Sequence, residues 1–133
     1  MEIIKKETVW KGSFMSAVRI TYRDAQEKVR TWEAVERVGI GGIVVMVAVT
    51  PGQSVLLEKQ FRPPLGRQVI ELPAGLVDPG ESMEEAAKRE LIEETGWAAK
   101  ELSFLAEGPI STGASTEILR AYLCTGLDHV GKA

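Results

Sequence analysis

The chain has few of the features that direct a protein to a membrane or to a disulfide-linked fold. Its 133 residues include one cysteine, Cys124, so no internal disulfide can form. This thiol lies in a strand-like segment, where a buried structural role is expected. The longest uninterrupted apolar run, 43–49, is far shorter than the about 20 residues of a membrane span, and residues 1–6 contain no apolar signal core. We therefore predict a cytoplasmic protein without a membrane partner.

Positive charge is also scarce. Sixteen Lys and Arg against nineteen Asp and Glu give a formal net charge of −3, which leaves no basic surplus to neutralise a phosphate backbone. A nucleic-acid partner is therefore not expected. The average hides a local excess, because residues 78–101 hold eight acidic and three basic residues, a net of −5, and the rest of the chain has a net of +2. The function has to account for this acidic segment.

The chain is rich enough in apolar residues, 44% of 133, to bury one core. The apolar segment 43–49 fits a central strand buried on both faces, and the turn signal at 50–53 predicts a hairpin with a returning strand over 54–61. The other strands, predicted from β-branched and aromatic residues, are 14–22 and 31–37, which form an N-terminal hairpin, and 69–72, 102–106 and 117–124.

One segment, residues 82–95, has strong helix signals. Ser82 with Glu85 three residues later forms a capping box, and Gly96 supplies the stop. Between these ends, apolar residues recur at helical spacing, which predicts one face packed on the core. The stripe consists of Met83, Ala86, Ala87 and Leu91.

Three glutamates share another face of this predicted helix. Glu90, Glu93 and Glu94 stand at i, i+3 and i+4, within one turn, where like charges repel by a few tenths of a kcal/mol per pair. A solvated helix face is one interpretation, and a bound cation is the other. Mg²⁺ and Mn²⁺ prefer oxygen ligands and commonly bridge carboxylates to substrate phosphates. Arg89 lies four residues before Glu93 and can pair with it.

The residues around this helix match every fixed position of the Nudix box. Gly75 is followed after five residues by Glu81, and after seven more by the segment 89–97, Arg-Glu-Leu-Ile-Glu-Glu-Thr-Gly-Trp. The sequence thus resembles the Nudix hydrolase family, which implies an α+β fold, an α/β/α sandwich with a mixed sheet and the Nudix loop-helix. Flanking segments resemble the ADP-ribose (ADP-sugar) pyrophosphatase branch of this family. They are residues 30–37, 59–64 and 71–75.

The resemblance assigns roles at the metal and the reacting bond. Glu90, Glu94 and the main-chain carbonyl of Ala74 would hold Mg²⁺ or Mn²⁺. Glu93 would assist them or interact with Arg89. The catalytic set implied by the resemblance is therefore Arg89, Glu90, Glu93 and Glu94, with Ala74, Glu90, Glu93 and Glu94 as metal ligands.

Further residues match substrate-binding positions of the family. Arg62 resembles the arginine that binds the diphosphate, and a surface arginine is its alternative. Trp32 resembles the aromatic residue that stacks on adenine, and packing on the sheet is its alternative. Arg37 and Glu71 would lie near the nucleotide, and Gly113 near the terminal sugar. In this branch the N-terminal strands often cross to a second subunit, so Trp32 and Arg37 would serve a partner's site.

The resemblance predicts a Nudix diphosphatase that hydrolyses ADP-ribose or a related nucleoside diphosphate sugar to AMP and a sugar phosphate. A hydrolase of another derivative, such as GDP-mannose, NADH or a damaged nucleoside triphosphate, stays open, as does a non-catalytic ADP-ribose sensor. Residues 1–38 would be dimerising strands and 39–133 the Nudix domain of a homodimer. The branch continues beyond the position of Ala133 with a glutamate used as base or metal ligand. Either the chain is cut short or Glu93 takes over that role.

Overall fold

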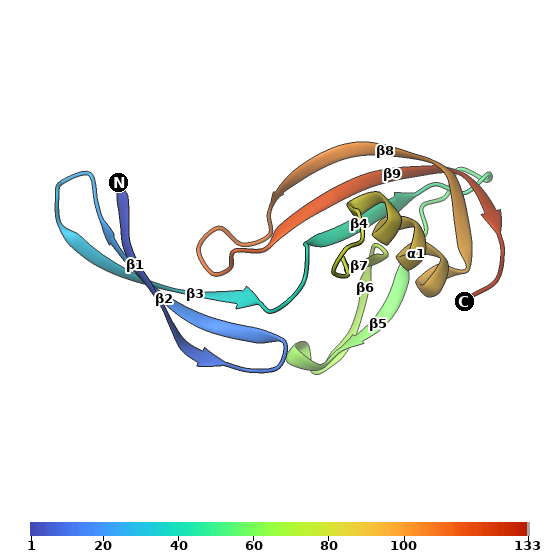
Figure 1. Cartoon of the computed structure of the whole chain (residues 1–133). Coiled ribbons are helices and arrows are strands. Elements are labelled where there is room, and N and C mark those ends of the chain that lie inside the picture. The colour runs from blue at the N-terminus through green and yellow to red at the C-terminus, as the bar shows by residue number, and fades with distance from the viewer. Residues whose placement is uncertain (133) are drawn as a thin grey trace. The chain divides into compact units, whose positions relative to one another are not determined.

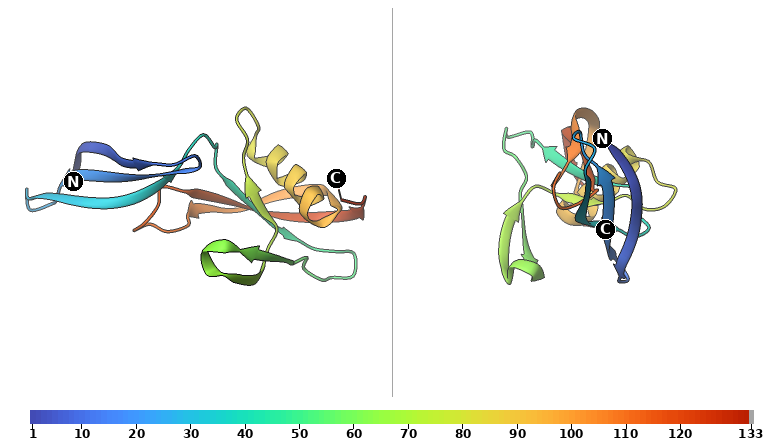
Figure 2. Two further views of the ribbon diagram at one scale, coloured as in Figure 1. Left: turned by 90° about the horizontal axis from the view of Figure 1, so that it is seen from below. Right: turned by 90° about the vertical axis from the view of Figure 1, so that its left-hand side faces the viewer.

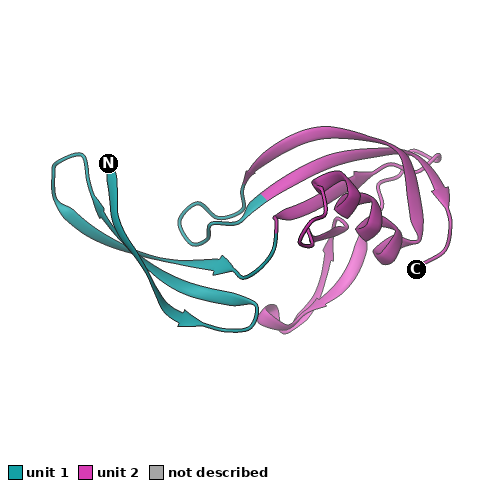
Figure 3. Ribbon diagram, in the orientation of Figure 1, with its two compact units in different colours: residues 1–40, 109–118 teal, residues 41–108, 119–133 magenta. Residues whose placement is uncertain are grey.

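The computed structural model describes residues 1–132, which form two compact units (Figure 3). Unit 1 comprises Met1–Ile40 and Pro109–Ile118, and unit 2 comprises Gly41–Gly108 and the chain from Leu119 onward. The N-terminal segment 1–38 thus falls within unit 1. That unit also takes in a loop from far along the sequence.

Residues 1–132 contain nine strands, one α-helix and one short 3-10 helix (Figure 1). None of their helices is long and apolar enough to cross a membrane. In chain order the elements are β1 (Glu2–Lys11), β2 (Met15–Arg23), β3 (Val29–Arg37), β4 (Ile43–Ala48), β5 (Glu58–Arg62), η1 (Pro63–Leu65), β6 (Arg67–Glu71), β7 (Ala74–Leu76), α1 (Met83–Thr95), β8 (Trp97–Pro109) and β9 (Ile118–His129).

Unit 1 is an antiparallel sheet in the order β1-β2-β3. The predicted N-terminal hairpin is confirmed as β2 and β3, with Ile20 opposite Trp32 in its register. Strand β1 was not predicted, and most of its residues are exposed on both faces, so it lacks the alternation that marks a half-buried strand. The loop of unit 1 lies along β3, where the Val35 amide donates to the Ala114 carbonyl at 2.8 Å.

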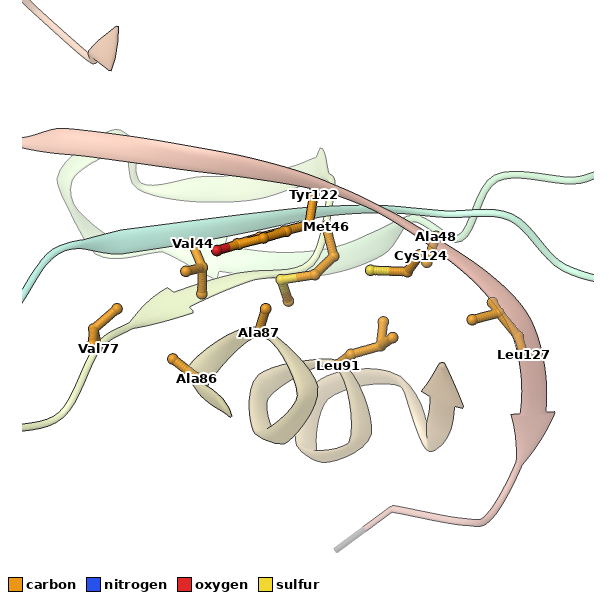
Figure 4. Close-up of a cluster of buried hydrophobic side chains, with 10 residues drawn as sticks. All are labelled: Val44, Met46, Ala48, Val77, Ala86, Ala87, Leu91, Tyr122, Cys124 and Leu127. Atoms are coloured by element: carbon orange, nitrogen blue, oxygen red, sulfur yellow. The ribbon is translucent and has the colours of Figure 1, made fainter. Parts of the chain in front are cut away.

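Unit 2 holds a mixed sheet in the order β7-β4-β9-β8, in which β4 is antiparallel to β7 and parallel to β9. The predicted central strand is therefore confirmed as the interior strand β4. Helix α1 packs on this sheet through the predicted apolar stripe, with Ala86, Ala87 and Leu91 fully buried (Figure 4). Among residues 1–132, α1 is the single α-helix and provides one helical layer of the expected sandwich. The strand residues facing it include Val44, Met46, Ala48, Tyr122 and Cys124.

The predicted hairpin of 43–49 with 54–61 is wrong in its pairing. Strand β5 pairs antiparallel with β6 instead, and the expected pairing is reduced to a bridge between Val49 and Val55. The turn explains the difference, because the 3-10 helix ends at Gly66, whose φ of 62° lies in the left-handed region that glycine adopts easily. The β5–β6 hairpin forms an arm beside the four-stranded sheet (Figure 2).

The predicted structural role of Cys124 is confirmed. Its side chain has no exposed area and belongs to the core beneath α1. Burial raises the pKa of this thiol to about 11, so that it stays protonated and unreactive.

Candidate active site

The carboxylate-bearing helix α1 is held in register by its N-terminal cap. The Glu85 amide donates to the Ser82 hydroxyl at 3.2 Å, and the Ser82 amide donates to the Glu85 carboxylate at 2.8 Å. This reciprocal pair confirms the predicted capping box and satisfies two amides that the first turn leaves free. Because the cap and the buried stripe fix the rotation of the helix, they also fix the side on which its glutamates project.

The Glu90 side chain lies directly against the backbone of Gly75 on β7. A Cβ atom at Gly75 would stand 2.0 Å from the Glu90 carboxyl carbon and 2.2 Å from its Cγ atom. Real non-bonded atoms do not approach so closely, so only glycine leaves room for this carboxylate. Gly75 is a fixed position of the Nudix box, and the close approach of Glu90 is the physical reason for a glycine there.

Glu94 contacts Ala74, which precedes Gly75 on β7. The Ala74 amide donates to Glu94 Oε2 at 3.0 Å. Burial raises the pKa of the Glu94 carboxyl to about 7, and the negative charges of Glu58 and Glu90 act in the same direction, whereas the Ala74 amide and the Arg62 charge oppose it. The predicted ligands Ala74, Glu90 and Glu94 are thus brought together, and Glu94 carries a carboxyl that is costly to ionise without a cation.

Arg89 is held by several oxygens at once. Its Nε and Nη2 atoms both donate to the Glu81 carboxylate at 2.9 Å, which makes a two-pronged pair, and Nη2 also donates to the Leu76 carbonyl at 3.0 Å. Its Nη1 atom donates to Glu90 at 2.8 Å and to Glu93 at 3.3 Å. The hydrogen bonds to Glu81 and Glu90 raise the pKa of Arg89 further above its usual value, although burial opposes them.

The pairing predicted between Arg89 and Glu93 is therefore present, but it is the longest of these contacts. The Arg89–Glu81 pair was missed, because a spacing of eight residues across a loop and a helix gives no signal in the sequence. The Arg89 hydrogen bonds hold the Glu81 pKa below its usual range. Arg89 thereby ties the loop before α1 to the helix itself.

Arg62 and Glu71, predicted separately, form an ion pair on the β5–β6 hairpin. The Arg62 Nε and Nη2 atoms approach one oxygen of Glu71, Oε1, at 2.8 and 2.7 Å. Both residues belong to unit 2, together with the carboxylates of α1. The positive charge of Arg62 lowers the pKa of the Glu94 carboxyl, against the larger effect of burial.

The remaining predicted residues, Trp32, Arg37 and Gly113, lie in unit 1. The Trp32 indole donates from Nε1 to the Gly113 carbonyl at 2.8 Å, and the Trp32 residue is 50% exposed. Half of the Trp32 surface is therefore open to solvent, and the other half is covered by neighbouring residues of unit 1. Arg37 donates from Nε to Glu117 at 2.6 Å. The loop of unit 1 thus holds both of these β3 side chains, through two hydrogen bonds that were not predicted from the sequence.

A cleft of about 490 Å³ opens beside Glu94, lined by residues of β5, the end of α1 and Lys132. Within residues 1–132, no three Asp, Glu, His or Cys side chains could hold a metal ion by themselves. A cation here would take further ligands from backbone carbonyls, water and phosphate, as Mg²⁺ usually does. The crowding of Glu58, Glu90 and Glu94 fits such a cation, because these like charges repel one another.

Comparison with known proteins gives consistent matches. Residues 41–129 match the NUDIX domain. The ADP-sugar pyrophosphatase of Mus musculus is 40% identical over 103 residues, which cover 71% of this chain and 47% of that protein. The ADP-ribose pyrophosphatase of Bacillus subtilis is 42% identical over 86 residues, which cover 65% of this chain and 46% of that protein. The chain spans about half the length of the curated relatives it matches.

A solved structure, described as the crystal structure of ADP compounds hydrolase, has the same fold. Its TM-score with this chain is 0.83, and the match covers 98% of this chain and 70% of that one. The two sequences are 22% identical over the match. At this identity the likeness concerns the fold alone.

Proposed function

Because the chain belongs to the Nudix hydrolase family, we propose that it hydrolyses the diphosphate bond of ADP-ribose or a related nucleoside diphosphate sugar, giving AMP and a sugar phosphate. The observation that carries this proposal is the assembly of two helix carboxylates on one strand, Glu90 against Gly75 and Glu94 on the Ala74 amide. The substrate class is supported by relatives named ADP-sugar and ADP-ribose pyrophosphatase.

Nudix hydrolases generally use divalent metal cations, and Mg²⁺ or Mn²⁺ is the cation we propose here. Glu90, Glu94 and the Ala74 carbonyl would hold it. When bound, such a cation neutralises phosphate charge and lowers the pKa of a water molecule. The Ala74 amide orients Glu94, and the Arg89 guanidinium orients Glu90, so that both carboxylates are set before a substrate arrives.

Glu93 has the freedom that a proton acceptor needs. Its side chain is 46% exposed, and its one contact from Arg89 is long at 3.3 Å. We assign to Glu93 the uptake of a proton from the attacking water, within this proposal. Arg62 offers a planar guanidinium that can bind a diphosphate through two hydrogen bonds, in exchange for its present contact with Glu71.

In the homodimer proposed below, the residues of unit 1 would recognise the nucleotide at a partner's site. The half-exposed indole of Trp32 can stack on a base, and its hydrogen bond to Gly113 fixes the plane of the ring. Arg37 would contribute positive charge near the nucleotide. The cytoplasmic location expected from the single cysteine stays a prediction.

We also propose a homodimer formed through unit 1. An apolar hollow of about 660 Å³ lies between β1, β2 and β3, and it is bordered by Trp10 and Phe14, which are 61% and 78% exposed. Exposed apolar surface of this kind favours association. Light scattering after size exclusion should report a dimer for the wild type and a monomer for Trp10→Ser/Phe14→Ser. The matched control is Phe104→Ser on β8, also exposed, which should stay dimeric.

A product assay tests the proposed reaction. The chain is incubated with Mg²⁺ and a panel of ADP-ribose, GDP-mannose, NADH, a diadenosine polyphosphate and 8-oxo-dGTP, and the products are separated by chromatography. We expect AMP and ribose 5-phosphate from ADP-ribose as the fastest reaction. Turnover of another compound instead would reassign the substrate. Binding of ADP-ribose without any turnover would replace the enzyme with a sensor.

A further inference from the structure

One face of β5 carries polar side chains where an apolar stripe is usual. Burial alternates along this strand, so Glu58, Gln60 and Arg62 are partly buried on one face, whereas Lys59 and Phe61 are exposed on the other. The Oε1 atom of Glu58 is buried and accepts no hydrogen bond in the structure. A buried carboxylate oxygen without a donor costs free energy, and it therefore calls for a functional explanation.

The negative charges of Glu71 and Glu90 increase this cost, whereas the positive charges of Arg62 and Lys132 reduce it. Glu71 stands opposite Glu58 in the register of the β5–β6 hairpin, and like charges in such a pair are unfavourable. Glu71 is compensated by Arg62, which it binds directly. The charges of Glu90 and Glu94 act on the same group of carboxylates, and Glu94 lines the same cleft as Glu58. A mobile cation in this cleft would relieve the repulsion.

We propose that Glu58 is a further acidic residue of the cation site, acting on a divalent cation through water and not as a direct ligand. This assignment rests on the proposed function, since it presupposes the cation. Among residues 1–132, no group of three or more His, Cys, Asp or Glu side chains is placed to hold a metal ion directly. Divalent cations of this type keep several waters, and groups that hold those waters influence affinity strongly.

Lys132 gives the competing explanation. It lines the same cleft, and its positive charge acts on the Glu58 carboxylate. If Glu58 serves only to neutralise Lys132, its removal would weaken cation binding indirectly, by leaving Lys132 to repel the cation. Removal of Lys132 as well would then restore the affinity. If Glu58 acts on the cation itself, the double substitution leaves the affinity low.

Calorimetric titration of Mn²⁺ into the full chain, without substrate, separates these explanations. We expect Glu58→Gln to raise the Kd for Mn²⁺ by about 10- to 100-fold. Glu58→Asp keeps the negative charge and should give an intermediate Kd. It also serves as the test variant if Glu58→Gln does not fold. Glu58→Gln/Lys132→Gln should bind as weakly as Glu58→Gln. The matched control is Glu101→Gln on β8, an exposed glutamate, which should bind like the wild type.

Three results would overturn the assignment. Folded Glu58→Gln with an Mn²⁺ affinity equal to that of the wild type removes Glu58 from the site and leaves the proposed function intact. Recovery of the Mn²⁺ affinity in the double variant would mean that Glu58 serves only to neutralise Lys132. Absence of Mn²⁺ binding by the wild-type chain overturns the proposed function and this assignment together.

Discussion

Replacing Glu94 with glutamine should stabilise the metal-free protein above neutral pH. Burial raises the pKa of this carboxyl from its ordinary 4.5 to about 7, with Glu58 and Glu90 adding their repulsion. A carboxyl with a higher pKa in the folded state contributes stability while it is protonated. That contribution is fully present below its unfolded pKa and is lost as the pH rises through about 7.

The size of the effect follows from the two pKa values. The rise from 4.5 to about 7 corresponds to about 3 kcal/mol, at about 1.36 kcal/mol per pKa unit. Because the Glu94 side chain is partly exposed and water screens its charge, we expect about 1–2 kcal/mol. Glutamine is neutral and can still accept the hydrogen bond from the Ala74 amide. Above neutral pH, the melting temperature of Glu94→Gln should therefore exceed that of the wild type by about 3–8 °C in a chain of this length.

Urea denaturation in the presence of EDTA, at about pH 5 and about pH 8, measures this difference. Glu94→Gln should be more stable than the wild type at the higher pH and nearly equal to it at the lower. Glu93→Gln is the matched control, because Glu93 is 46% exposed on the same helix, and its effect should be small and alike at both pH values. Added Mg²⁺ should stabilise the wild type and not Glu94→Gln. A variant less stable than the wild type at the higher pH would refute the reasoning.

Three further predictions concern other residues. Gly75→Ala should displace Glu90, since its Cβ would lie 2.0 Å from the carboxyl carbon, and kcat should fall about 100-fold in a product assay, whereas Gly108→Ala, with no atom within 4 Å, should leave kcat unchanged. Arg89→Lys, which cannot form the two-pronged pair with Glu81, should lower kcat about tenfold with the circular dichroism spectrum retained; unchanged kcat would contradict a positioning role. Cys124 should resist a thiol reagent in the native protein and react once urea unfolds it, and rapid native labelling would show that the core is open.

The helix and the central strand could be predicted because their signals are local. The capping box needs two side chains three residues apart, and the apolar run 43–49 predicts a strand directly, although the residues of one face of β4 are only partly buried. The same holds for the Nudix box, whose glutamates are spaced by the helical repeat. Local spacing therefore predicted both where α1 begins and which of its faces carries the carboxylates.

The partners of β5 and of Arg89 could not be predicted in this way. Strand pairing depends on which turn closes, and the turn signal at 50–53 predicted the pairing of 54–61 with the central strand, whereas β5 pairs with β6 through the turn at Gly66. The Arg89–Glu81 pair joins a loop to a helix, so its geometry depends on how α1 packs on β7. The role of Glu58 was missed for a similar reason, because a glutamate in a strand is ordinarily a solvent-facing residue.

The carboxylates of this site fall into two groups with opposite effects on stability. Glu81 and Glu90 accept hydrogen bonds from Arg89 and so contribute to the fold of the loop and the helix. Glu58 has a buried oxygen without a donor, and Glu94 has a raised pKa, so each costs stability when it is ionised. An ionised carboxylate that costs stability can become stabilising when a cation binds to it. The stabilisation by Mg²⁺ should therefore depend on Glu94 and Glu58. Loss of Arg89 should instead unfold the loop before α1, with a smaller effect on Glu94 and Glu58.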